Sequence, residues 1–227
     1  MTTNEVTRVT QVQGAEDKTM RERVVRPLYA LFGVILLGAG AALMLVGGVG
    51  VDPFTAMNRG IADQLGLGLG PVQLVMNLLL LAVVFFTGRY MIGLGTIINM
   101  VLVGYLITWF TALFSAVLPS AESLLGQAVY LVIALLIFDF GVSAYICAGS
   151  GTAPYDAIAP IVVERTGWAY RYVRWVQDIL VVIIAAILSG PVGLATVITA
   201  FFNGPLIEFF NKKVNQALVE KLVNRTL

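Results

Sequence analysis

Long apolar runs separated by short polar segments make up most of the chain. Uncharged or nearly uncharged runs occupy about residues 28–48, 72–87, 91–115, 125–148, 172–189 and 192–210. A helix needs about 20 predominantly apolar residues to cross the hydrocarbon core of a bilayer. Because each run approaches that length, the pattern predicts an all-α polytopic membrane protein with six transmembrane helices.

Two segments interrupt this pattern because they are shorter and more polar. Residues 53–65 contain Arg59 and Asp63, and residues 154–166 contain Asp156 and Glu164. A helix of such length and polarity does not span a bilayer. Each segment is therefore predicted to be a short helix that lies in the interface or re-enters the membrane.

A glycine- and proline-containing motif precedes each short helix. The two copies read GVGVDPFT at 48–55 and GSGTAPYD at 149–156. Glycine permits backbone conformations that other residues avoid, and proline suits the first turn of a helix. We therefore predict a helix break in each copy, carried by Gly50, Pro53, Gly151 and Pro154. Asp52 is the expected N-cap of the first short helix, whereas Ala153 offers no capping side chain.

The similarity of these motifs extends along the chain. Gly93–Phe110 and Gly193–Phe210 share eight identical residues in 18 positions, and earlier segments align at an offset of 101, as Pro53 does with Pro154. The chain therefore contains two repeats, at 28–115 and 125–210. Because each repeat has three spans and one short helix, the second enters the membrane from the opposite side, which predicts an inverted-topology repeat.

Basic residues indicate the orientation of this arrangement. Residues 1–27 form a polar, basic segment without apolar periodicity, which we expect to be a disordered tail, and residues 211–227 are expected to form an amphipathic helix. Arg89, Arg165 and Arg171 fall on the same side as both tails in the predicted topology. Cytoplasmic loops carry an excess of Lys and Arg, so both termini are expected in the cytoplasm.

Composition narrows the possible chemistry. Hydrophobic residues make up 59% of the chain and charged residues 12%, against about 45–50% and about 25% in soluble domains. The net charge of +1 argues against nucleic acid as a partner. The chain has no histidine and only one cysteine, Cys147, which excludes His-dependent nucleophilic catalysis and Cys metal clusters. We expect no cofactor, no metal and no enzymatic activity.

Polar residues within apolar runs are the candidates for function, because they are costly at membrane depth. Asp139 lies in the middle of the 125–148 run, where it could couple transport to protons or cations or, alternatively, bridge helices as a protonated or paired group. Asp178 matches Asn77 at the repeat offset, so the two could face each other at a substrate site. Alternatively, Asp178 belongs to the solvated inner end of its helix.

Asp156 and Thr55 are the matching residues directly after the two breaks. The start of a helix offers free backbone N–H groups that favour anions. An aspartate at that position can also satisfy these groups itself as a cap. Thr55, Asn77, Asp139, Asp156 and Asp178 are thus the candidate substrate- or ion-binding residues.

The motif segments GVGVDPFTAMNRG and GSGTAPYDAI, together with GLATVITAFFNGPLIEFF, resemble the YczE/YitT-like family of bacterial integral membrane proteins. The resemblance covers roughly residues 28–210. It implies a duplicated multi-span layout in the bacterial cytoplasmic (inner) membrane and membership among candidate transporters or uncharacterised proteins. The first copy reads Asp-Pro-Phe-Thr, where the family more often has Pro, an aromatic residue and Asp. This departure argues against a role that needs matching carboxylates in both repeats.

These observations favour secondary transport, or facilitated passage, of a small solute, with proton coupling as one option. The site is expected at the interface of the repeats, where unwound backbone can line a cavity. The alternative is a non-transporting accessory or scaffold protein that assists a partner. Expected partners are the lipid bilayer and a small-molecule solute, with a homo-oligomer or another membrane protein as further options.

Overall fold

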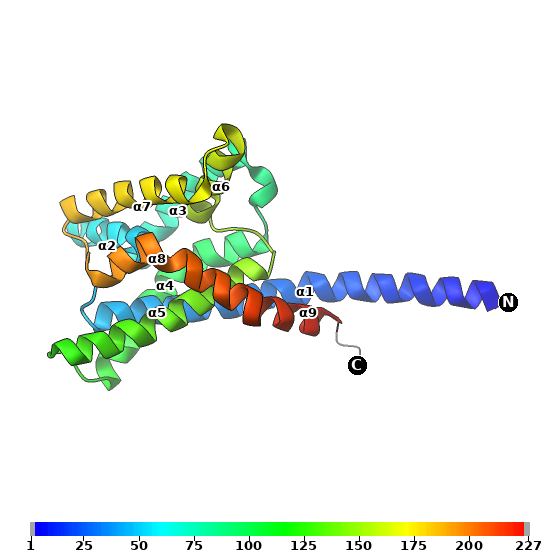
Figure 1. Cartoon of the computed structure of the whole chain (residues 1–227), viewed down its shortest axis with the longest axis horizontal. Coiled ribbons are helices and arrows are strands. Elements are labelled where there is room, and N and C mark those ends of the chain that lie inside the picture. Colours follow the sequence, from blue (N-terminus) through cyan, green and yellow to red (C-terminus); the bar gives the residue numbers. More distant parts are fainter. Residues whose placement is uncertain (1–2, 225–227) are drawn as a thin grey trace.

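The structure is a computed structural model that describes the backbone of residues 3–224 and the side chains of residues 22–224. Within this range the chain folds into helices and contains no strand (Figure 1). The α-helices are α1 (Thr3–Val46), α2 (Pro53–Leu65), α3 (Leu69–Thr87), α4 (Leu94–Val117), α5 (Leu124–Cys147), α6 (Pro154–Thr166), α7 (Tyr170–Ile187), α8 (Leu194–Phe210) and α9 (Gln216–Asn224). A 3-10 turn, Arg89–Met91, precedes α4, and a π-helical turn, Asn211–Asn215, joins α8 to α9.

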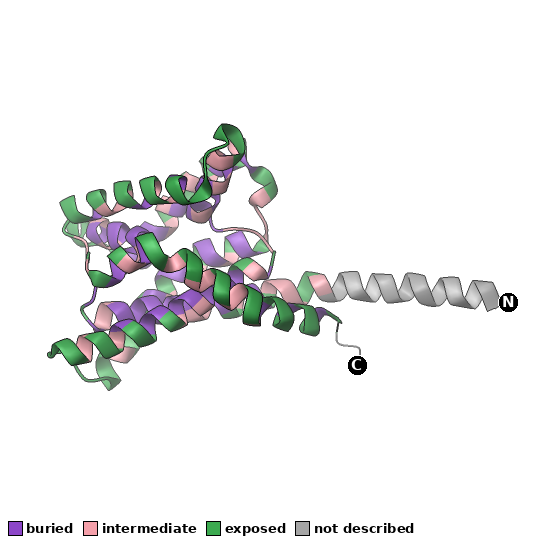
Figure 2. Ribbon diagram, viewed as in Figure 1, coloured by how far each residue is buried: buried purple, intermediate pink, exposed green. Residues whose placement is uncertain are grey.

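Helices α1 and α5 pack against each other, and many of their residues are buried (Figure 2). Small residues allow this close approach. A Cβ atom on Gly33 would lie 2.4 Å from the backbone nitrogen of Tyr145, and one on Gly141 would lie 2.4 Å from that of Leu37. Helices in membranes associate through such small-residue contacts, since lipid provides no hydrophobic driving force between them.

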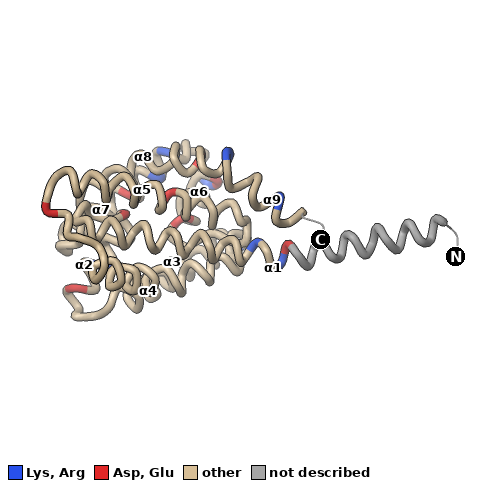
Figure 3. Tube along the Cα trace, turned by 90° about the horizontal axis from the view of Figure 1, so that it is seen from below, with Lys and Arg blue, Asp and Glu red and all other residues tan. Residues whose placement is uncertain are grey.

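Five helical segments in the described part of the chain are long and apolar enough to cross a membrane. They are Glu22–Val46, Leu69–Thr87, Leu94–Val117, Leu124–Cys147 and Leu194–Asn224. Charged residues are sparse along the bundle (Figure 3), and large apolar side chains such as Phe86 and Trp109 are exposed on its outside. The chain is therefore a multi-pass membrane protein. The span expected at 172–189 corresponds to α7, which carries Arg171, Arg174 and Asp178 and is not one of these five segments.

The two predicted short helices are α2 and α6. The Asp52 side chain caps α2, because its Oδ1 accepts a hydrogen bond from the Thr55 backbone N–H at 3.0 Å. Helix α6 follows Ala153 without a side-chain cap. Both the expected cap and its absence in the second copy are confirmed.

Each helix break pairs with the turn before the last long helix of the other repeat. The backbone hydrogen bonds are Val51 N to Pro191 O (3.2 Å) and Ala195 N to Val49 O (2.9 Å) at the first break, and Thr152 N to Met91 O (2.9 Å) and Gly95 N to Ser150 O (2.7 Å) at the second. Residues far apart in the sequence thus exchange equivalent bonds at both breaks. We call this pair of contacts the reciprocal interlock.

Glycine is required at both points of the interlock. Gly50 and Gly151 have φ angles of +87° and +115°. A Cβ atom on Gly50 would lie 2.4 Å from the Gly193 nitrogen, and one on Gly151 would lie 2.5 Å from the Gly93 nitrogen. The two motif glycines therefore permit both the turn and the contact between backbones.

The chain begins and ends with helices in the described part of the structure. Helix α1 begins at Thr3 and so includes residues 3–27. The side chains of residues 1–21 are outside the described part of the structure, so the disorder expected for that tail stays a prediction. Helix α9 has the expected amphipathic character, and its buried residues Val219 and Val223 pack with Tyr29 and Ala30 of α1.

Candidate functional site

A cavity of about 600 Å³ lies between the two repeats. Helices α1 to α8 all contribute to its walls, together with both helix breaks. Its polar lining includes Asp52, Thr55, Gln73, Asn77, Asn99, Asp156, Arg171, Arg174, Asp178, Thr199 and Asn203. Four of the five predicted candidates, Thr55, Asn77, Asp156 and Asp178, therefore meet in one place.

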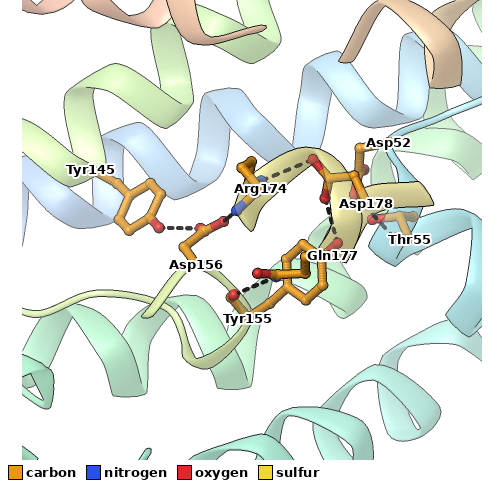
Figure 4. Close-up of polar contacts among 8 residues, drawn as sticks. All are labelled: Asp52, Thr55, Tyr145, Tyr155, Asp156, Arg174, Gln177 and Asp178. Carbon is orange, nitrogen blue, oxygen red and sulfur yellow. Dashed lines mark hydrogen bonds and ion pairs between the residues drawn. The ribbon is translucent and has the colours of Figure 1, made fainter. Parts of the chain in front are cut away.

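One wall of the cavity carries an ionic cluster, formed by Asp156, Arg174 and Asp178 (Figure 4). Nη1 of Arg174 lies 3.0 Å from Oδ1 of Asp156, and Nε lies 2.9 Å from Oδ2 of Asp178. The Tyr145 hydroxyl donates to Asp156, and the Tyr155 hydroxyl donates to Oδ1 of Asp178 at 2.5 Å. A single guanidinium thus holds two carboxylates, each of which also accepts a tyrosine hydrogen bond.

Local helix geometry explains how these groups meet. Arg174 and Asp178 are four residues apart on α7, so they share one helix face. Asp156 lies in the first turn of α6, which precedes α7 in the chain. Asp178 is 1% exposed, and a carboxylate so deeply buried is costly unless it is paired and hydrogen-bonded. The cluster meets that requirement within the protein.

The aromatic residues of the two break motifs meet beside this cluster. The Phe54 and Tyr155 rings stack with centroids 4.6 Å apart and an interplanar angle of 21°. The Arg174 guanidinium lies 5.0 Å from the Tyr155 ring centroid. Since Phe54 and Tyr155 occupy matching positions of the two repeats, their stacking brings both helix breaks to the same cavity.

The other wall carries the repeat-related counterparts of the ionic cluster. At the offset of 101 residues, Thr55, Gln73 and Asn77 correspond to Asp156, Arg174 and Asp178. These three residues, which we call the neutral cluster, are buried. Oδ1 and Nδ2 of Asn77 and Oε1 of Gln73 have no hydrogen-bond partner among the described residues. The same positions are therefore charged and ion-paired in one repeat but neutral in the other, where amide atoms of Gln73 and Asn77 have no partner among the described residues.

Asp52 adds a third carboxylate to the cavity lining. Its Oδ1 caps α2, whereas its Oδ2 is buried without a hydrogen-bond partner in the described part of the chain. Burial raises the pKa of Asp52 to about 6, hydrogen bonds from Thr55 oppose this rise, and the charges of Asp156 and Asp178 add to it. This carboxylate therefore titrates close to neutral pH.

Asp139, the fifth candidate, does not line the cavity. It is completely buried on α5, and neither carboxylate oxygen has a hydrogen-bond partner among the described residues. One turn further along α5, Ser143 accepts a hydrogen bond from Asn215 at 2.9 Å, and Asn215 accepts one from Tyr29 at 2.6 Å. Asp139 thus shares a helix face with Ser143. The role of Asp139 in coupling stays a prediction.

Several cavity residues were absent from the sequence candidates. Arg174 is not among those candidates, although its position four residues before Asp178 indicates an ion pair on one helix face. Applying the repeat offset to Arg174 would also have identified Gln73. No cluster of three or more His, Cys, Asp or Glu side chains suitable for a metal occurs in the part of the chain that the structure describes.

The sequence profile of a family of unknown function, DUF6198, matches residues 24–212, which cover both helix breaks and the whole cavity lining. The chain belongs to this family. The DUF6198 match includes every helix from the membrane part of α1 through α8. It excludes α9 and most of the N-terminal tail.

Individual relatives of this DUF6198 chain come from bacteria. The uncharacterized membrane protein YczE of Bacillus subtilis (strain 168) is 27% identical over 207 residues, covering 91% of this chain and 94% of that protein. An uncharacterized protein of Haemophilus influenzae is 27% identical over 180 residues, which are 79% of this chain and 80% of that protein. The uncharacterized protein YyaS of Bacillus subtilis is 24% identical over 195 residues, covering 86% and 96%.

These matches confirm the predicted resemblance to a YczE-like family of bacterial membrane proteins. No solved structure matches the chain.

Proposed function

We propose that the chain is a non-enzymatic secondary transporter or facilitator that moves a small solute across the bacterial cytoplasmic membrane. The observation that carries this proposal is the cavity of about 600 Å³, which both helix breaks line. Irregular backbone at membrane depth is tolerated where it is buried in protein or lines a cavity. Many transporters bind their substrate at the interface of two repeats, beside discontinuous helices.

The reciprocal interlock supports an inverted repeat. The first break pairs with the turn near Pro191, and the second pairs with the turn near Met91. If each repeat crosses the membrane three times, these two contacts lie toward opposite sides of the membrane. Each contact then joins two segments on the same side, as backbone hydrogen bonding requires.

Helix α7 fits the role of the sixth span in this proposal. Its three charged side chains, Arg171, Arg174 and Asp178, all line the cavity, while Leu180, Ile183 and Ile187 on the same helix are exposed. Ionisable residues within membrane helices usually face the bundle interior or a water-filled cavity. The charges on α7 are therefore compatible with a membrane crossing. Six crossings would put both termini on the same side of the membrane, and the basic residues near both ends favour the cytoplasmic side.

Uptake by proteoliposomes tests the proposal. The full chain would be reconstituted, the membrane potential held with potassium and valinomycin, and the entry of labelled glycerol, choline and lactate compared with entry into protein-free liposomes. We expect at least one probe to enter faster when the protein is present. Equal rates for all three probes would contradict a general small-solute facilitator and favour the accessory-protein alternative.

A reversible chemical block of the cavity supplies the matched control for the uptake measurement. Thr152 lines the cavity and is half-buried, so Thr152→Cys in a Cys147→Ala background gives a single thiol there. Modification with a methanethiosulfonate reagent should reduce uptake, and dithiothreitol should restore it. Uptake that ignores the modification would mean that the solute does not pass through this cavity.

A further inference from the structure

The carboxylates of the cavity outnumber the cations that pair with them. Asp156 and Asp178 share Arg174, and Asp52 forms no ion pair among the described residues. Arg171 also lines the cavity, but it is exposed. The cavity therefore contains one carboxylate that the protein does not neutralise at close range.

Arg171 is engaged elsewhere. Its Nη2 donates a hydrogen bond to the Tyr172 hydroxyl at 3.0 Å, and its guanidinium lies 4.8 Å from the centroid of the same ring. Asp52, in contrast, keeps a buried and unpartnered Oδ2. A buried carboxylate is costly without a cation nearby, so a positively charged ligand would supply what this oxygen lacks.

The ionic cluster leaves little opportunity for an anion. Arg174 already contacts both Asp156 and Asp178. An anionic ligand would have to displace one of these carboxylates and would also approach Asp52. The charge distribution therefore disfavours anions.

The neutral cluster indicates polar groups on the ligand. Asn77 and Gln73 are 1% and 3% exposed, and three of their four amide atoms have no partner in the described part of the chain. A buried amide that makes no hydrogen bond is destabilising. Hydroxyl, amide or ammonium groups of a bound solute would satisfy these atoms.

Aromatic rings complete the lining. Phe54 and Trp175 contribute to the cavity walls beside Tyr155, whose ring already contacts Phe54 and Arg174, and aromatic faces attract ligand cations, including quaternary ammonium groups. We propose that the cavity recognises a small organic cation that carries further hydrogen-bonding groups, with Asp52 facing the positive centre and Asn77 and Gln73 binding the polar groups. This inference rests on the proposed function, because it names the class of solute that would be moved.

Charged thiol reagents test the inference without knowledge of the natural solute. In the Thr152→Cys, Cys147→Ala chain, the modification rates would be measured with a trimethylammonium-ethyl methanethiosulfonate and with its anionic sulfonatoethyl analogue. The ratio of the two modification rates is divided by the ratio of the rates at which the same reagents modify 2-mercaptoethanol in solution. This division corrects for the difference in intrinsic reactivity between the reagents. We expect a preference for the cationic reagent of about tenfold or more, because the unpaired Asp52 in the same cavity attracts one reagent and repels the other at low effective dielectric.

Two single-charge variants provide the controls. Asp52→Asn should abolish most of the preference while keeping the cap of α2, because Asn is an equally good N-cap. Asp63→Asn removes the same charge from the same helix, but Asp63 is exposed, pairs with Arg59 and does not line the cavity. It should leave the preference unchanged.

The inference would be overturned by a preference for the anionic reagent or by no preference. It would also be overturned by a thiol that reacts only after denaturation, or by an equal loss of the preference in both variants. The result is separable from the proposed function. A cation preference without uptake of any probe would keep the site and reject transport. Uptake without a cation preference would keep transport and reject the assignment of solute class.

Discussion

Asn77 and Asn215 are both buried asparagines, yet their surroundings differ. Asn215 accepts a hydrogen bond from Tyr29 and donates one to Ser143. Asn77 makes no hydrogen bond through its side chain to the described residues. Because an unpaired buried polar group costs about 1–3 kcal/mol, the amide of Asn77 is hard to explain by stability alone. A bound solute that pairs with this amide, as proposed above, would account for it.

The same substitution at these two sites should therefore have opposite effects. Asn77→Leu should leave the free energy of unfolding unchanged or raise it by about 1 kcal/mol, whereas Asn215→Leu should lower it by about 2 kcal/mol because two buried partners lose their bonds. Both values can be measured by unfolding of the full chain in mixed micelles. A large loss of stability in Asn77→Leu would show that its amide has a structural partner.

Asp52 predicts a pH dependence of the cavity. Burial raises the pKa of Asp52 to about 6, and Asp156 and Asp178 face it with like charge while Arg174 pairs with them. The carboxylate is charged above this pH and neutral below it. The preference for the cationic reagent at Thr152→Cys should therefore fall as the pH drops from 7.5 to 5. In Asp52→Asn the preference should be small and independent of pH. If the preference of that variant also declined as the pH fell, the titrating group would be one other than Asp52.

Sequence reasoning found most of the site residues through the repeat offset. Thr55 with Asp156 and Asn77 with Asp178 were matched as pairs, and all four line the cavity. The depth of Asp139 in an apolar run makes it a candidate, but depth does not indicate which helix face a residue occupies. Asp52 was recognised only as a cap, because its second, unpartnered oxygen becomes evident only in three dimensions.

At the scale of elements, α7 differs from its counterpart α3 by the charges that it carries toward the cavity. Arg174→Gln should destabilise the chain by about 2–4 kcal/mol, since it leaves two carboxylates without their cation. The triple variant Asp156→Thr, Arg174→Gln, Asp178→Asn copies the neutral cluster into the second repeat and should recover most of that loss. Unfolding in mixed micelles measures both, and a triple variant less stable than the single one would contradict the equivalence of the two clusters.

The helix breaks make a second prediction at this scale. Gly50→Ala and Gly151→Ala should each cost about 3 kcal/mol or more, because the added methyl group meets backbone atoms within 2.5 Å. Gly48→Ala is the control. Gly48 also has a positive φ, +64°, but a Cβ atom added there would meet nothing within 4 Å, so only the cost of a left-handed residue, about 1 kcal/mol, is expected. Equal thermal stability of all three variants in detergent would argue against the interlock.

Helix positions followed well from the apolar runs, because a bilayer-spanning helix imposes a length that the sequence reveals directly. The short helices α2 and α6 have the predicted bounds of residues 53–65 and 154–166. The pairing of each break with the opposite repeat was not predicted. Backbone hydrogen bonds between distant segments leave no residue-specific signal beyond the glycines that permit them.

At the scale of the whole molecule, the inverted repeat predicts opposite sidedness for matched positions. Leu67 and Trp168 correspond at the repeat offset, and they are 55% and 62% exposed at the ends of α2 and α6. In a Cys147→Ala background, an impermeant maleimide should label Leu67→Cys only from outside the cell and Trp168→Cys only from the cytoplasmic side, as inside-out vesicles would show. Labelling of both from one side would exclude the inverted topology.

The reciprocal interlock also bears on how the chain is synthesised. When the ribosome has completed the first repeat, the break at Gly50 still lacks Pro191 and Ala195, its partners in the finished protein. The first half therefore cannot reach its final form before the second half has been inserted. The backbone hydrogen bonds of the reciprocal interlock would join two separate half-length chains as readily as they join two parts of one polypeptide. Two fragments divided in the connection between α4 and α5, when made in the same cell, should therefore assemble into the native bundle.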